Sequence, residues 1–125
     1  MASGMTIPER RRQPRIAERV VMAISDAGTE LTTESQNLST AGVYCTLDRF
    51  LSPMSKVQLV FALPNGSLSS TVRCAGVVVR VEPVIAHASR GQFNVAIFFT
   101  ELSDRDRSAI TRLVRQRLSA SSATD

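Results

Sequence analysis

Short runs rich in β-branched and aliphatic residues, separated by turn residues, dominate the middle of this chain. Runs of this kind predict β-strands, and an all-β domain repeats them at short intervals. Because no helical pattern lies between them, we expect the strands to pair antiparallel in a barrel or a sandwich. The six predicted strands are Arg19–Asp26, Thr29–Gln36, Ala41–Leu47, Val57–Leu63, Leu68–Glu82 and Gln92–Thr100.

Glycine marks the predicted turns and bends of this sheet. Ala27-Gly28 lies between the first two strands, and Asn65-Gly66 follows the fourth. Asn-Gly is a strong hairpin signal because both residues tolerate positive φ. Gly76 falls inside the longest run, where a missing side chain is typical of a bulge or a barrel corner. We therefore expect two tight hairpins and a bend at Gly76.

The end of the chain has a helical period instead. Ser103 and Asp106 resemble a capping box, in which side chains satisfy the free N–H groups of a helix start. The residues that follow predict a helix whose apolar stripe packs on the core. This stripe consists of Ile110, Leu113, Val114 and Leu118. The arginines that lie off it are expected to form a solvated face, with a contribution to a binding surface as the alternative; they are Arg105, Arg107, Arg112, Arg115 and Arg117.

Length and composition fit one domain. The chain has 125 residues, of which 43% are hydrophobic. Its longest apolar stretches reach 5 residues, whereas a transmembrane helix needs roughly 20. Residues 1–7 contain no apolar core of signal-peptide length. We expect a cytoplasmic protein without membrane insertion, with a disordered leader over residues 1–9, a single domain over 10–118 and a frayed tail over 119–125.

Cysteine and histidine give little support to metal binding or catalysis. Cys45 and Cys74 are too few for a disulfide scaffold or a four-cysteine zinc site, and we expect reduced, buried thiols. His87, the one histidine, lies in a predicted surface loop with no serine or cysteine motif beside it. The sequence contains no phosphate-binding Walker loop and no dinucleotide-binding glycine motif. We predict no catalytic residue, no metal and no cofactor.

Arginine is concentrated near the start of the chain. The formal net charge is +4, and residues 1–20 contribute +3 of it, from five arginines and two glutamates. Arginine pairs bidentately with phosphate or a guanine edge and stacks on flat rings, which lysine does not. A basic arm also suits nucleic acid, but aromatic residues are 5% with no Trp, which supplies a stacking surface poorly. The clustered arginines are Arg10, Arg11, Arg12, Arg15 and Arg19.

Two short segments stand out together. One is Glu9-Arg10-Arg11-Arg12-Gln13-Pro14-Arg15, and the other, about 20 residues later, is Asn37-Leu38-Ser39-Thr40-Ala41-Gly42. In this order they match the RxxxR and (D/N)xSxxG motifs, and the chain resembles the PilZ domain family from Glu9 to about Leu118. Arg11 and Arg15 fall on the first motif, and Asn37, Ser39 and Gly42 on the second. Ala96 stands where the family often has glycine.

This resemblance implies a six-stranded antiparallel barrel with an arginine-rich leader, a C-terminal helix and a site for the second messenger cyclic di-GMP. Arg11 and Arg15 would bind phosphate or a guanine edge. Asn37 and Ser39 would offer donors and acceptors, with Asn37 a neutral amide where the family also uses Asp. Gly42 leaves room for a close approach or an unusual φ.

We expect Arg10 and Arg12 to contact phosphate or solvent, and Arg19 either the ligand or a surface ion pair. The expected mechanism is that the ligand orders residues 1–15 over the barrel and creates a surface for an unidentified downstream protein. Ligand stoichiometry and oligomeric state stay open. A basic nucleic-acid-binding module and a ligand-free protein-interaction adaptor are the alternative functions.

Overall fold

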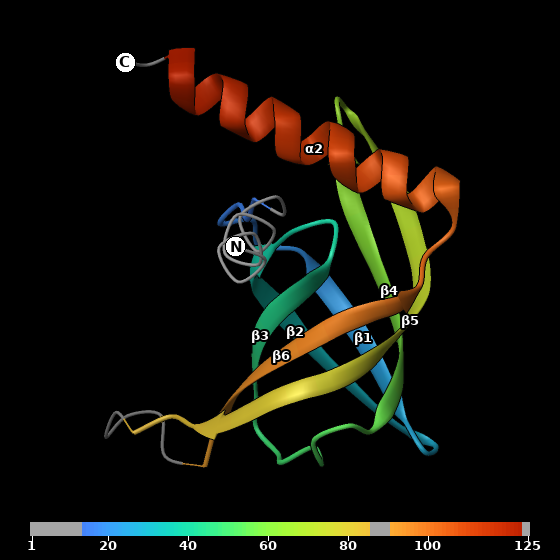
Figure 1. The fold of residues 1–125 in the computed structure, drawn as a ribbon, viewed down its shortest axis with the longest axis vertical. Helices are drawn as coiled ribbons and strands as arrows, with labels where there is room; N and C mark the ends of the chain where they lie inside the picture. Colours follow the sequence, from blue (N-terminus) through green and yellow to red (C-terminus); the bar gives the residue numbers. More distant parts are fainter. Residues whose placement is uncertain (1–13, 86–90, 124–125) are drawn as a thin grey trace, which may run out of the picture.

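The computed structural model describes residues 14–85 and 91–123. Six antiparallel strands close into a barrel in the order β1-β2-β3-β6-β5-β4, with β1 hydrogen-bonded to both β2 and β4 (Figure 1). The elements are β1 (Val21–Asp26), β2 (Thr29–Leu38), β3 (Gly42–Leu47), β4 (Lys56–Asn65), β5 (Leu68–Pro83), β6 (Phe93–Glu101) and α2 (Asp104–Ala123). The predicted barrel with a C-terminal helix is confirmed.

The turns follow the predicted glycines with one difference. Ala27 and Gly28 both have positive φ, 52° and 89°, as the type I′ turn of a two-residue hairpin requires. Asn65 is instead the last residue of β4, paired with Leu68, and the positive φ of this hairpin falls on Gly66, at 64°. The register of β5 against β6 shifts at Gly76, which confirms the predicted bulge.

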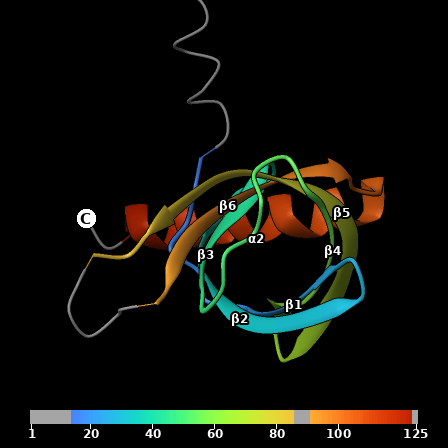
Figure 2. The ribbon, with the colours of Figure 1, turned by 90° about the horizontal axis from the view of Figure 1, so that it is seen from below.

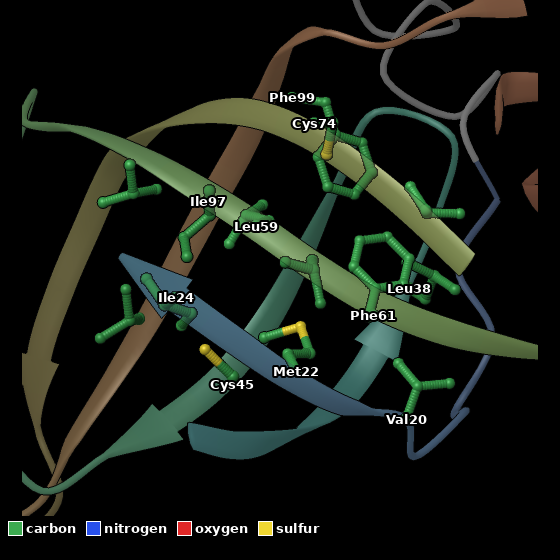
Figure 3. Close-up of a cluster of buried hydrophobic side chains, with 14 of the residues drawn as sticks. Val20, Met22, Ile24, Leu38, Cys45, Leu59, Phe61, Cys74, Ile97 and Phe99 are labelled. Carbon is green, nitrogen blue, oxygen red and sulfur yellow. The ribbon is translucent and has the colours of Figure 1, made fainter. Parts of the chain in front are cut away.

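Alternate side chains of the strands fill the centre of the barrel, as the β4 residues Val57, Leu59, Phe61 and Leu63 illustrate; Figure 3 shows Leu59 and Phe61 among them. Figure 2, a view from below, shows the strands as a ring around this core. Burying each such side chain contributes roughly 1.5–3 kcal/mol. The ring of Phe61 stacks on that of Phe99 with centroids 6.1 Å apart.

Cys45 and Cys74 both lie in this core as free thiols, as the sequence predicts (Figure 3). Burial raises the pKa of Cys45 and of Cys74 to about 12, and the charge of Asp106 adds to the effect at Cys74. Both side chains therefore stay protonated at neutral pH and act as small apolar core residues.

Helix α2 lies across one end of the barrel and packs on β4 and β5 (Figure 1). The Ser103 hydroxyl accepts a hydrogen bond from the Asp106 amide at 3.0 Å, which confirms this residue as the cap. Ile110, Leu113 and Val114 are buried as predicted. Within the described residues, no helix has the length and apolarity to cross a bilayer.

The prediction that Leu118 packs on the core is wrong, because this side chain is 41% exposed. The second half of α2 extends past the strands of the barrel, so the end of the apolar stripe lies beyond the strands on which its first part packs (Figure 1). The helix itself continues to Ala123, beyond residue 118, where the sequence predicts that the domain ends.

Residues 14–20 lie along β2. We call them the leader segment, which is distinct from the leader predicted over residues 1–9. The Ile16 amide donates to the Leu38 carbonyl and the Leu38 amide to the Ile16 carbonyl, both at 2.9 Å. Val20 is also fixed: its amide donates to the Ser35 hydroxyl at 2.9 Å, and that hydroxyl donates to the Glu18 carbonyl at 2.5 Å. The side chains of Ile16 and Val20 are buried. The leader segment is therefore part of the folded domain.

Ser35 is the side chain that holds this segment, and its removal tests the attachment. Ser35→Ala leaves the Val20 amide and the Glu18 carbonyl without their partner in a buried place, so the free energy of unfolding should fall by about 1–3 kcal/mol. Urea unfolding measures this. Ser69→Ala, at an exposed β5 position, should change stability by less than about 0.5 kcal/mol. Equal stability of the two variants would contradict the assigned role.

Candidate functional site

The two segments that stand out in the sequence meet on the outer surface of the barrel. Arg15 Nη1 donates a hydrogen bond to Asn37 Oδ1 at 2.8 Å. The Ile16–Leu38 backbone pair lies beside this contact and fixes both residues. Arg15 is exposed and Asn37 half-buried. A guanidinium has five N–H donors, and among the described residues only this bond uses one of them, so the site offers several donors to an anionic or base-edge ligand.

Ser39 is fully buried and its hydroxyl faces the backbone. Its Oγ accepts hydrogen bonds from the Ala41 amide at 3.0 Å and the Gly42 amide at 3.2 Å. The Ser39 amide in turn donates to the Gly42 carbonyl at 3.0 Å. These bonds close the turn between β2 and β3, so in this arrangement Ser39 shapes the turn that follows Asn37.

Gly42 is required by the packing of β3 against β6. A Cβ atom at this position would lie 2.2 Å from the Ile97 carbonyl oxygen and 3.2 Å from the Phe98 Cα. The close approach that the sequence predicts at Gly42 is therefore made by the backbone of β6. Since backbone atoms cannot move aside as a side chain can, only glycine fits here.

The strand register continues the site along the barrel wall. Asn37 pairs with Tyr44 on β3, and Tyr44 pairs with Ala96 on β6. Directly opposed residues in a sheet have Cβ atoms about 4.5–5.5 Å apart. The side chain of Tyr44, the single tyrosine, therefore leaves the backbone next to Asn37. Ala96 takes its place in the β6 ladder without a glycine.

Part of the predicted site lies outside the described residues, namely Arg10, Arg11 and Arg12, and so does His87. Arg19 is described and exposed. Within the described ranges its side chain makes no ion pair, so the predicted alternative of a surface ion pair is not realised there.

A second contact of the leader segment links it to α2, and nothing in the sequence indicated it. Arg117 Nε donates to Glu18 Oε1 at 2.7 Å and Arg117 Nη2 to Glu18 Oε2 at 3.2 Å. This hydrogen bonding raises the pKa of Arg117. The partners are 99 positions apart, and the sequence predicts Arg117 on the solvated face of the helix. Ser35 was missed in the same way, because a serine in a strand carries no signal of its partners.

A closed β-barrel whose leader segment brings an arginine onto an Asn-x-Ser-x-x-Gly turn defines the class of this domain: a small barrel with a polar site on its outer wall. A family model described as the PilZ domain matches residues 9–116, and the chain belongs to the PilZ family. No curated protein matches the chain in sequence.

Solved structures share the fold at low sequence identity. MotI/DgrA, the inhibitor of motility from Bacillus subtilis, has a TM-score of 0.75 at 21% identity over 88% of this chain and 52% of its own. The PilZ domain of YcgR from Escherichia coli with c-di-GMP has 0.66 at 15%, over 93% and 98%. The MrkH–c-di-GMP complex of K. pneumonia has 0.64 at 18%, over 93% and 56%. The chain thus spans about half the length of MotI and MrkH.

A methyl group at Gly42 tests the close approach of β6. Gly42→Ala should lower the free energy of unfolding by about 1–3 kcal/mol, because the added Cβ displaces backbone. Gly76→Ala is the matched comparison: a Cβ there would lie 2.7 Å from Ile97 Cγ2 and 3.0 Å from the Phe98 carbonyl oxygen, both farther than the 2.2 Å approach at Gly42, and it should cost less. Thermal unfolding of both variants gives the order, and a smaller loss for Gly42→Ala would contradict this account.

Proposed function

We propose that this chain is a receptor for cyclic di-GMP that acts by binding and not by catalysis. The observation that carries the proposal is the hydrogen bond between Arg15 and Asn37, which joins the two motifs on one surface of a PilZ domain. Two of the solved relatives, the YcgR domain and MrkH, are described with c-di-GMP, which supports the same ligand class here.

The chemistry of the exposed groups suits this ligand. Cyclic di-GMP has two phosphates and two guanines, so it needs charged donors and groups that pair with a guanine edge. The Arg15 guanidinium pairs bidentately with guanine O6 and N7 or with a phosphate. An amide oxygen has two lone pairs, so Asn37 Oδ1 can accept from Arg15 and from a guanine N–H together. Ser39 and Gly42 contribute by fixing the turn that carries Asn37.

The proposal extends to the N-terminal arginines. Ligand phosphates bind Arg11, with Arg10 and Arg12 as additional donors, and order the segment that carries these residues over the barrel wall. The ordered segment and the ligand then form a new surface for a downstream protein. The link from Glu18 to Arg117 supports such coupling, because it connects the leader segment to the exposed half of α2.

Calorimetric titration with cyclic di-GMP tests this function. The unaltered protein should bind, and Arg11→Ala and Arg15→Ala should each weaken the affinity about 5- to 150-fold, the equivalent of about 1–3 kcal/mol for a bidentate guanine contact. Arg112→Ala is the matched control, because this arginine is exposed on α2, and it should leave the affinity unchanged.

Three results would contradict the proposal. The first is the absence of heat at tens of micromolar ligand, and the second is an affinity of Arg11→Ala and Arg15→Ala unchanged from that of the unaltered protein. The third is tight binding of duplex DNA with a steep dependence on salt, which is the signature of phosphate-backbone recognition.

A further inference from the structure

A polar groove of about 640 Å³ runs along the barrel wall. Its lining comes from the leader segment, from β1, β2, β3 and β6, and from Val84 and Gln92, which follow β5 and precede β6. We call it the wall groove and define it by Arg19, Glu34, Gln36, Thr46 and Asn94. Its size lies in the range of small-molecule sites in proteins. None of these residues belongs to the two motifs.

The floor of the wall groove is a fixed chain of polar side chains across three strands. Gln36 Nε2 donates to Thr46 Oγ1, which donates to Asn94 Oδ1 at 3.0 Å. The Thr33 hydroxyl secures the same strand by donating to the Thr46 carbonyl at 2.7 Å. Side chains held in this way present donors and acceptors in set positions, which favours recognition of a planar polar group.

The two charged residues of the groove have opposite signs, and both are exposed. Within residues 14–85 and 91–123, neither the Arg19 nor the Glu34 side chain makes a hydrogen bond or ion pair. Guanine is the base with acceptors O6 and N7 on one edge and N–H donors on the other. Arg19 suits the first edge and Glu34 the second. A phosphate would instead be repelled by Glu34.

Strand neighbours connect the wall groove to the motif site. Gln36 precedes Asn37 in β2, and Thr46 is two residues from Tyr44, the strand partner of Asn37. Two residues along a strand span about 7 Å, a distance that one dinucleotide can bridge. Arg19 follows Arg15 by four residues on the same segment.

We propose that the wall groove binds the second guanine of a cyclic dinucleotide whose first guanine is held at Arg15 and Asn37. This inference rests on the proposed function and adds a base-reading role for Arg19 and Glu34. The motif site alone contacts one end of the ligand, and the groove makes the protein select for guanine at both ends.

A mixed ligand separates the two sites. In cyclic GMP-AMP with two 3′–5′ linkages, one guanine is replaced by adenine. Adenine lacks the N1–H and N2–H groups from which the Glu34 carboxylate would accept hydrogen bonds. The unaltered protein should bind it about 10-fold or more weakly than cyclic di-GMP, because each guanine contact is worth about 1–3 kcal/mol. In Glu34→Gln, whose amide both donates and accepts, the ratio should fall to about threefold or less.

Glu30→Gln is the matched control, because Glu30 is exposed on the same strand and does not line the groove; it should keep the full ratio. Arg19→Ala should weaken cyclic di-GMP binding about 10-fold. If the protein binds cyclic di-GMP but the Glu34 and Arg19 variants keep its affinity and its ratio, this inference is overturned and the proposed function stands. If the unaltered protein does not bind cyclic di-GMP, the proposed function itself fails.

Discussion

The antiparallel backbone pair between Ile16 and Leu38 is the contact on which the arrangement of the candidate site depends. Its two 2.9 Å hydrogen bonds seat the leader segment on β2, one residue from Arg15 on one side and from Asn37 on the other. The buried Ser35 hydroxyl secures the same segment four residues later, at Val20. A flexible arm would have to lose conformational entropy to bring its arginine to this place. Here the backbone beside Arg15 is already fixed when the domain folds.

Around this pair, buried and exposed residues have separate tasks. Ser39 and Gly42 are buried. The Ser39 hydroxyl closes the turn, and Gly42 lets β6 approach. Arg15 and Asn37 face outward with hydrogen-bonding capacity to spare. The wall groove extends this surface with polar and charged side chains from three strands. The barrel therefore serves as a rigid support, and its outer wall supplies the chemistry.

Much of the fold was predictable, because local sequence patterns determine strands, turns and helices. The contacts between elements could not be predicted, because they depend on distances that no local pattern gives. Alternation and turn chemistry gave the strands and the bulge at Gly76. The helical spacing of apolar residues extends to Leu118, yet this residue is exposed. Such spacing does not indicate where along the helix the barrel ends. The motifs predicted which residues share a site, and Arg15 does contact Asn37. The buried role of Ser39 and the groove at Glu34 follow from the strand register and became visible only in the structure.

Amide hydrogen exchange in the purified protein without nucleotide tests the central claim most directly, which is that the leader segment belongs to the folded barrel. The account predicts that the amides of Ile16 and Leu38, which bond each other's carbonyls, exchange more than about 100-fold slower than in an unfolded chain, an opening free energy of about 2.7 kcal/mol. Exchange of the Ile16 amide at the unfolded rate, while the core amide of Leu59 stays protected, would contradict it.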